Sequence, residues 1–270
     1  METGAKTASV ILAAGRGTRM KGFSGNKTLL PLIPGRSSYD GARPMLLQIL
    51  ESLPSGPKAV VVHHKKEAVM GATHGLGLTY CEQKELNGTG GALLAARPFL
   101  ESQMVEQIIV TMGDVPLVRE DTYEALVRDL RDTRLTVLGF RPQDKRQYGV
   151  LEIDEGFVKR IIEYKYWKTF PKDRQAPLEV CNSGIYAARR HDFLRYLSVL
   201  ASRPHKIQKE INGHWVETEE FFVTDLVEYM SQDGLPVGYV LAEDETEVMG
   251  VDDPSALRRA QRIFEGLMTR

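Results

Sequence analysis

A short apolar run at residues 9–14 passes directly into a loop that contains Gly15 and Gly17. Such a run is typical of a parallel strand buried on both faces, and a parallel strand needs a long crossover to reach its neighbour. Strand-like and helix-like segments then alternate through the first half of the chain. This order predicts an α/β fold, in which helices flank a doubly wound, mostly parallel, Rossmann-like sheet with a smaller β-containing subregion.

Sequence patterns also place elements along the rest of the chain. Strands are expected at residues 9–14, 59–63, 77–81, 107–112, 135–140, 150–153, 157–163, 180–188 and 236–241. Helices are expected at residues 44–53, 89–100, 121–131, 189–201, 224–232 and 253–268, the last capped by Asp253. The pair Glu155-Gly156 predicts a hairpin turn, and the polar residues 165–177 with their two prolines predict a loop.

Charge, hydropathy and cysteine content limit the classes of partner and the cellular location that the sequence supports. The 270 residues carry a formal net charge of −1, so no global positive field points to nucleic acid or an anionic membrane. No stretch reaches the roughly 18 apolar residues of a membrane helix, and residues 1–9 lack the apolar core of a signal peptide. Cys81 and Cys181 lie in apolar stretches and are expected to be reduced thiols. We therefore expect a soluble, cytoplasmic protein, for which small anionic substrates stay open because a cleft can be locally basic.

The loop after the first strand is the main candidate for chemistry. Its small residues allow a ligand to approach the backbone, and successive N–H groups can hold phosphate oxygens. Arg19 and Lys27 add cations suited to phosphate. The spacing is not a Walker A motif, and Met20 stands where a dinucleotide motif needs its third glycine. The loop alone therefore predicts an anion cradle, with a simple tight turn as the alternative.

Two carboxylates are candidates for a metal site. Asp114 follows a predicted buried strand, and ligands of such sheets bind beyond the carboxyl ends of strands. Mg²⁺ prefers one or two carboxylates together with phosphate oxygens. Asp252 can be the second carboxylate, because Asp253 fits better as the cap of the last helix. For both, the alternative is a local turn or cap.

Residues 83–90 form a loop that enters a predicted helix. Gln83 offers a donor and an acceptor, which suits the edge of a base. Gly88 permits a planar ring to pack closely. The alternative is a capped helix start, with Thr89 as the cap.

Taken in chain order, these motifs resemble the sugar-phosphate nucleotidyltransferase family. The pattern is most similar to the pyrophosphorylase (uridyltransferase) domain of the bifunctional enzymes that synthesise UDP-N-acetylglucosamine. The matching segments are residues 12–20 with Lys27, Gln83 with 88–90, 113–117, 148–149, 162–165, 182–185, 222–225 and 247–252. They extend over almost the whole chain.

The resemblance implies a Mg²⁺-dependent enzyme that makes a UDP-sugar, above all UDP-N-acetylglucosamine, and pyrophosphate from UTP and a sugar 1-phosphate. It implies one domain over residues 1–270, with a nucleotide-binding half (1–140), a sugar-binding half (141–252) and a C-terminal helix (253–270). Arg19 and Lys27 would be catalytic, and Asp114 and Asp252 would bind the metal. Nucleotide-binding residues would be Leu12, Ala13, Ala14, Gly15, Gly17, Thr18, Gln83, Gly88 and Thr89, and the sugar would contact Gly149, Glu163 and Asn182.

The sequence departs from the family in four places. Asp252 stands where the most similar relatives usually carry asparagine, which makes the metal site more anionic. The segments 32–44 and 163–182 are longer than in the family, and the second contains Tyr166, Trp167 and Phe170, which either close over a substrate or pack as core. No hexapeptide repeat is visible, so acetyltransferase activity is not expected.

Three alternatives to a UDP-N-acetylglucosamine enzyme stay open. The same reaction can use another nucleotide or sugar, such as glucose 1-phosphate. A regulatory module that binds a nucleotide sugar without catalysis would keep the fold. A glycosyltransferase would carry a D-x-D metal motif, whereas Asp252 and Asp253 are adjacent. The absence of H-E-x-x-H and G-x-S-x-G leaves zinc and serine hydrolases unsupported.

Overall fold

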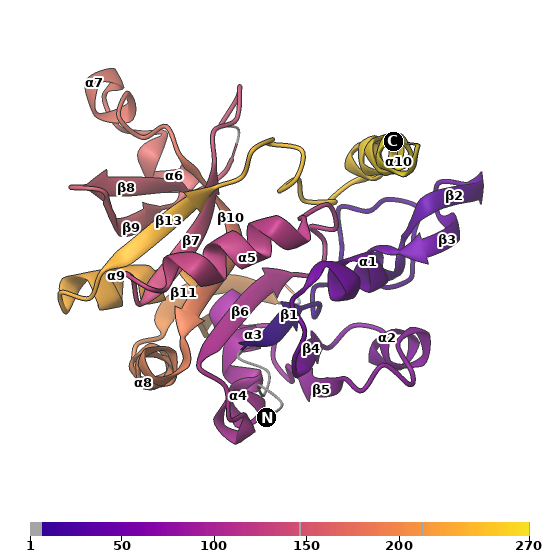
Figure 1. Cartoon of the computed structure of the whole chain (residues 1–270), viewed down its shortest axis with the longest axis horizontal. Helices are drawn as coiled ribbons and strands as arrows, with labels where there is room; N and C mark the ends of the chain where they lie inside the picture. The colour runs from indigo at the N-terminus through magenta and orange to yellow at the C-terminus, as the bar shows by residue number, and fades with distance from the viewer. Residues whose placement is uncertain (1–6, 146, 212, 270) are drawn as a thin grey trace.

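The computed structural model describes residues 7–145, 147–211 and 213–269, and one nine-stranded sheet organises them (Figure 1). Seven strands follow one another across it: β13 (Val237–Leu241), β7 (Leu135–Phe140), β10 (Cys181–Arg189), β6 (Gln107–Met112), β1 (Thr7–Leu12), β4 (Lys58–Val62) and β5 (Thr79–Glu82). The strand β10 runs antiparallel to both neighbours, and the other neighbouring pairs are parallel. The predicted α/β fold with a mostly parallel sheet is confirmed.

The hairpin of β8 (Val150–Asp154) and β9 (Phe157–Ile162) joins this sheet through β10. Its turn lies at Glu155 and Gly156, which have φ values of 50° and 81°. The left-handed backbone at two successive residues matches the turn that the sequence predicts at this pair.

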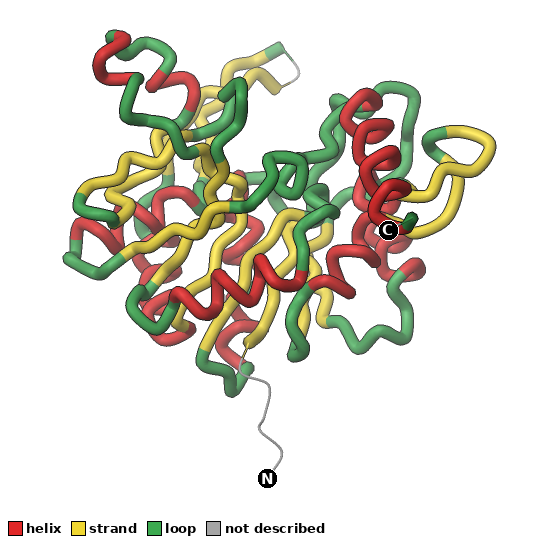
Figure 2. Tube along the Cα trace, turned by 45° about the horizontal axis from the view of Figure 1, so that its top comes forward, coloured by secondary structure: helices red, strands yellow, loops and turns green. Residues whose placement is uncertain are grey.

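Helices cover both faces of the sheet (Figures 1 and 2). One face packs against α1 (Met45–Ser52), α2 (Lys66–Ala72) and α5 (Glu120–Asp129), and the other against α3 (Gly88–Ala95), α4 (Arg97–Ser102), α8 (Arg190–Ala201) and α9 (Thr224–Gln232). In β1, Val10 and Leu12 contact one apolar cluster while Ile11 and the following Ala13 contact the other. Both faces of the strand are therefore buried, as its continuous apolar run predicts. No helix in the described ranges is long and apolar enough to cross a membrane.

Two predicted segments differ from the structure. The helix expected at residues 89–100 is two helices, because Pro98 has no N–H to bond the carbonyl of Leu94. The loop expected at residues 165–177 contains two single-turn helices, α6 (Tyr164–Trp167) and α7 (Lys172–Gln175). The buried indole of Trp167 holds the first of them on the core.

Two hairpins have no counterpart in the sequence predictions. They are β2 (Pro31–Ser37) with β3 (Asp40–Pro44), and β11 (His205–Ile211) with β12 (His214–Glu220). The strand β2 contains Pro34 and Gly35 and is exposed over most of its length, so it lacks the alternation of apolar and polar residues that marks a half-buried strand.

The C-terminal helix α10 (Pro254–Met268) packs beside the first of these hairpins (Figure 2). Asp253 caps it as predicted, since its carboxylate accepts the N–H groups of Ser255 and Ala256 at 2.8 and 2.9 Å. The buried Gln261 side chain donates to the backbone carbonyls of Pro31 and Ser38. This packing brings Asp252, directly before the helix, to the carboxyl ends of the strands.

Candidate active site

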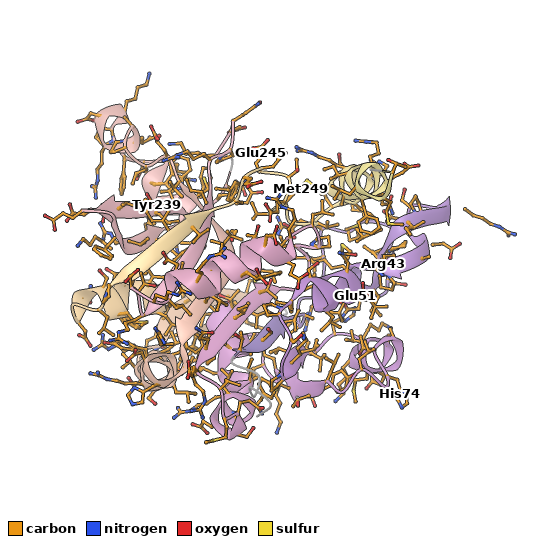
Figure 3. The ribbon with its side chains drawn as sticks, viewed as in Figure 1. Arg43, Glu51, His74, Tyr239, Glu245 and Met249 are labelled. Carbon is orange, nitrogen blue, oxygen red and sulfur yellow. The ribbon has the colours of Figure 1, made fainter. Side chains whose placement is uncertain are left out.

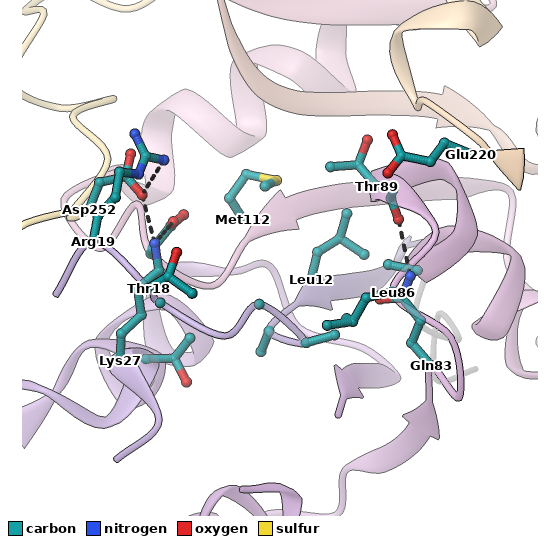
Figure 4. A pocket seen from close by; sticks show the side chains of 18 residues that line it. Leu12, Thr18, Arg19, Lys27, Gln83, Leu86, Thr89, Met112, Glu220 and Asp252 are labelled. Carbon is teal, nitrogen blue, oxygen red and sulfur yellow. Dashed lines mark hydrogen bonds and ion pairs between the residues drawn. The ribbon is translucent and has the colours of Figure 1, made fainter. Parts of the chain in front are cut away.

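A pocket of about 450 Å³ lies beyond the carboxyl ends of β1 and β6 (Figure 4). Thirteen residues that the sequence singled out line it: Leu12, Ala13, Ala14, Gly15, Gly17, Thr18, Arg19, Lys27, Gln83, Gly88, Thr89, Asp114 and Asp252. Arg19, Lys27 and Asp252 lie at one end, and Gln83 and Thr89 lie at the other. All the candidate nucleotide, catalytic and metal residues therefore share one pocket, and the three candidate sugar residues are not among its lining.

The glycines of the first loop differ in what surrounds them. A Cβ atom on Gly15 would meet no protein atom within 4 Å, so the backbone there is open to a ligand. Gly17 has a φ of +62°, and a Cβ there would lie 3.2 Å from Cβ of Lys27. Met20 is buried against α10, which explains why the third position of a glycine motif is a large apolar residue here. Glycine at position 15 therefore leaves the backbone open to a ligand, whereas glycine at position 17 permits the left-handed backbone of the turn.

Lys27 begins a 3₁₀ turn, η1 (Lys27–Leu29), whose position is fixed by a buried asparagine. The Asn26 side chain accepts the backbone N–H of Thr28 at 3.0 Å and its hydroxyl at 2.8 Å, and donates to the carbonyl of His64 at 2.8 Å. A cap of this kind orients the first residue of the turn. It directs the Lys27 side chain toward the two candidate metal carboxylates.

The Lys27 ammonium lies between Asp114 and Asp252. Its Nζ is 2.6 Å from Oδ2 of Asp114 and 2.7 Å from Oδ1 of Asp252. Burial alone would lower the pKa of Lys27, but the two carboxylates together outweigh burial and raise the pKa above its ordinary value. Arg19 reaches Asp252 at 3.2 Å with a side chain that is 73% exposed. One cation is thus held between the carboxylates, and a second, paired with Asp252, is largely exposed at the pocket.

The same two carboxylates fit a divalent cation. The backbone N–H of Val251 donates to the carbonyl of Asp114 at 2.8 Å, which joins the two segments that carry them. They already hold a cation in common, the Lys27 ammonium. No group of three or more acidic, histidine or cysteine side chains in the described ranges forms a complete metal cage. A Mg²⁺ ion here would therefore take its remaining ligands from phosphate oxygens and water, as this ion commonly does.

At the other end of the pocket, each predicted base-binding residue also has a structural role. The buried Gln83 amide donates to the Asn87 side chain and to the Gly88 carbonyl, both at 3.1 Å. Gly88 has a φ of +92°, and a Cβ there would lie 2.3 Å from the carbonyl oxygen of Phe221. Both residues shape the backbone of this end.

Thr89 does not cap the helix, contrary to the alternative derived from the sequence. The N-cap of α3 is Asn87, and its side chain makes no capping hydrogen bond. The Thr89 hydroxyl instead accepts the N–H of Val223 at 3.2 Å, and the N–H of Gly90 donates to Phe221 at 2.8 Å. The helix start is therefore tied to the segment that follows β12.

The candidate sugar residues lie together, apart from the pocket lining. The N–H of Asn182 donates to the Gly149 carbonyl at 2.9 Å, and a Cβ on Gly149 would lie 3.6 Å from Oε2 of Glu163. The Asn182 side chain donates to Tyr186 and accepts the N–H of Gly184. Its polar atoms are thus already engaged within the protein.

Glu163 has an exposed side chain, yet protein atoms pack on one side of it. This partial burial raises the pKa of its carboxyl; the Asp225 charge adds to the rise, and Lys165 opposes it. Asn182 is linked toward the pocket through Gly184, whose N–H it accepts and where a Cβ would lie 3.3 Å from Cγ of Met112. Met112 lines the pocket, so Asn182 is separated from it by Gly184 and Met112.

The aromatic segment before Asn182 is divided between core and surface. Trp167 is buried, and its Nε1 donates to the Tyr148 carbonyl at 2.8 Å. Phe170 packs against the same apolar cluster. Tyr166 is 55% exposed. The core alternative is therefore confirmed for Trp167 and Phe170.

Five lining residues were missed by the sequence reasoning: Thr28, Leu86, Ala92, Met112 and Glu220. Four of them directly neighbour, or lie within a turn of, a recognised motif. Glu220 comes from β12 and pairs with Lys209 of β11. It was missed because the hairpin that carries it was not predicted.

The sequence matches known proteins over most of its length. A model of the MobA-like NTP transferase domain matches residues 9–213. The bifunctional protein GlmU of Alcanivorax borkumensis is 32% identical over 96% of this chain and 52% of its own length. GlmU of Paramagnetospirillum magneticum is 33% identical over 96% of this chain and 53% of its own. The chain thus spans about half the length of the curated relatives it matches.

Solved structures share the fold at low sequence identity. A UDP-N-acetylglucosamine pyrophosphorylase from Trypanosoma brucei superposes with a TM-score of 0.72 and 14% identity, over 95% of this chain and 65% of that one. A protein described as a glucose-1-phosphate thymidylyltransferase from Bacillus anthracis superposes with a TM-score of 0.66 and 19% identity, over 95% and 94% of the two chains. Both likenesses support the fold.

Proposed function

The chain belongs to the MobA-like NTP transferase domain family, and from this premise we propose that it transfers a nucleotidyl group from UTP to a sugar 1-phosphate, above all N-acetylglucosamine 1-phosphate. One observation carries the proposal. A ligand-accessible glycine loop, two cations and a pair of carboxylates line a single pocket at the carboxyl ends of β1 and β6. Anionic ligands that need a divalent cation fit that combination.

Asp114 and Asp252 are the residues that would hold Mg²⁺. When bound, the ion would neutralise charge on the triphosphate. Lys27 holds these carboxylates together, and in the proposed reaction its ammonium would also meet a phosphate oxygen. Arg19, at the mouth of the pocket, supplies the second cationic contact.

The chemistry is an in-line displacement at the α-phosphorus of the triphosphate. A phosphate oxygen of the sugar 1-phosphate forms the new P–O bond, the bond to the β-phosphate breaks, and pyrophosphate leaves with that electron pair. A phosphate monoester has a second pKa of about 6, so the nucleophile is largely ionised at neutral pH and needs no general base. This agrees with a lining in which the described residues include no histidine or cysteine. Catalysis then rests on positioning and charge stabilisation.

The two ends of the pocket suggest how the substrates lie. The open backbone at Gly15 would meet the phosphates, and the loop of Gln83 and Gly88 would meet the base. The group of Gly149, Glu163 and Asn182, of which Asn182 is linked toward the pocket through Gly184 and Met112, would meet the sugar.

We also propose that the protein works in the cytoplasm. Cys81 and Cys181 are both buried and unpaired. Burial raises the pKa of both thiols, that of Cys181 to about 11. Unreactive, reduced thiols fit a reducing compartment.

A screen of nucleoside triphosphates against sugar 1-phosphates, read by pyrophosphate release, tests the proposal. We expect UTP with N-acetylglucosamine 1-phosphate to give the highest kcat/KM. If glucose 1-phosphate is the best acceptor, the proposed reaction stands but the proposed sugar is wrong. Tight UTP binding without turnover on any acceptor would contradict an enzymatic role and favour a module that binds nucleotide sugars without catalysis.

A further inference from the structure

The stretch that carries Asp252, residues 242–253, contains turns and bends but no strand or helix. It crosses from the end of β13 to the start of α10, and Figure 3 shows Glu245 and Met249 along it. Such a stretch has no ladder of backbone hydrogen bonds to fix a side chain. The distance between Asp252 and Asp114 must therefore be set by other contacts.

One of these contacts is a buried carboxylate. Glu247 is 5% exposed and is the one acidic residue among the buried side chains in the described ranges. Its Oε1 accepts the backbone N–H of Arg119 at 3.1 Å and the hydroxyl of Thr122. Its Oε2 accepts the Arg119 guanidinium at 3.2 Å. A buried charge is tolerated when several donors, one of them cationic, surround it in this way.

These donors belong to the segment that carries Asp114. Arg119 is the N-cap of α5 and closes the loop that begins at Asp114, and Thr122 lies in the first turn of the helix. The hydrogen bond from Val251 to the Asp114 carbonyl is one cross-link between the two segments. The Glu247 contacts form a second cross-link, buried and further from the pocket, and the exposed pair of Glu243 with Arg119 is a third. One cross-link allows rotation about itself, whereas a second one that is buried fixes the relative orientation.

We propose that Glu247 is a positioning residue that sets the spacing of Asp114 and Asp252, and thereby the affinity of this pair for a divalent cation. The inference rests on the proposed function, because it takes the two aspartates as metal ligands. Glu247 is not part of the pocket lining and acts through the stretch that leads to Asp252. Outer contacts that orient metal ligands commonly change metal affinity by about 10–100-fold.

The test compares Glu247→Gln with a matched control, Glu243→Gln. Glu243 pairs with the same Arg119 guanidinium, but its side chain is 80% exposed. Binding of Mn²⁺ without nucleotide is measured by electron paramagnetic resonance, with thermal unfolding as the check on folding. We expect Glu247→Gln to weaken Mn²⁺ binding about 10–100-fold and Glu243→Gln to leave it unchanged. The Mg²⁺ concentration that half-activates turnover should rise in parallel, with kcat recovered at saturating Mg²⁺.

A second variant covers the case in which Glu247→Gln does not fold. Thr122→Val keeps the shape of the side chain and removes one donor to the carboxylate, and it should weaken Mn²⁺ binding in the same direction. Wild-type Mn²⁺ affinity in a folded Glu247→Gln protein would overturn the inference and leave the proposed function standing. If the wild-type protein binds no Mn²⁺, the metal site of the proposed function fails as well.

Discussion

The two ends of the proposed substrate site are built from different materials. The nucleotide end combines backbone that is open at Gly15 with charged side chains, among them Lys27 and Asp114. The sugar end consists of side chains that already bond within the protein, such as Asn182 with Tyr186 and Gly184. A backbone cradle is complete once the fold forms, whereas a side-chain site depends on the loops around it. The nucleotide end should therefore dominate turnover, and the sugar end should tune acceptor affinity.

The strongest test of this contrast is the metal pair at the nucleotide end. Asp114→Ala should lower pyrophosphate release by at least about 10³-fold, because charge neutralisation by a metal contributes several kcal/mol to such reactions. Steady-state assays at several Mg²⁺ concentrations measure the loss. Asp132→Ala, which removes an exposed carboxylate just after the C-terminal end of α5, is the control. Wild-type turnover in Asp114→Ala would remove the metal assignment.

The next largest effect is expected for substitution of Lys27, which should lower both kcat and the stability of the metal-free protein. Lys27→Met should reduce kcat about 10²–10³-fold through the loss of charge stabilisation. It should also destabilise the metal-free protein by about 1–3 kcal/mol. Removing one partner of a buried ion pair typically lowers the free energy of unfolding by about 3–5 kcal/mol. The loss is expected to be smaller here because Asp252 is 38% exposed and solvent screens its charge.

Added Mg²⁺ should then raise the melting temperature of Lys27→Met more than that of the wild-type protein. The reason is that the ammonium already lies between the carboxylates in the wild type. Thermal unfolding with and without Mg²⁺ measures the difference. An equal gain in both proteins would show that the ammonium and the metal do not share this position.

A pair of glycine variants tests whether the nucleotide end is a backbone site. Gly15→Ala should leave stability unchanged, because nothing lies within 4 Å of the new Cβ, yet raise the KM for UTP about 10–100-fold by displacing the phosphates. Gly88→Ala should instead lower stability by about 2 kcal/mol or more, because of its φ of +92° and the contact with Phe221. Chemical denaturation and nucleotide KM together distinguish them. A destabilised Gly15→Ala, or a nucleotide KM that does not move, would contradict the open cradle.

The same contrast explains what could be predicted from the sequence. The fold follows from the buried strands, and this pattern is local. The thirteen residues that meet at the pocket came from motifs in the loops, taken together with the family resemblance. Glu220 was missed because its strand pairs across a hairpin of exposed residues with no clear period. The division of the predicted helix near Pro98 is also a local signal, because proline cannot donate a helical hydrogen bond. The distance between the sugar candidates and the pocket depends on how β8, β9 and β10 pair, which no local pattern encodes.

The smallest expected effect lies at the sugar end, in Glu163→Gln. The change keeps the shape and removes a carboxylate acceptor, so the KM for the sugar 1-phosphate should rise about 10-fold while the KM for UTP stays constant. Glu152→Gln is the matched control, because Glu152 lies on the hairpin that ends directly before Glu163 and pairs with Arg160. Stability should change little, since the Glu163 side chain is exposed. A rise in the UTP KM instead would mean that Glu163 contacts the nucleotide, and the division of the substrate site into a nucleotide end and a sugar end would be wrong.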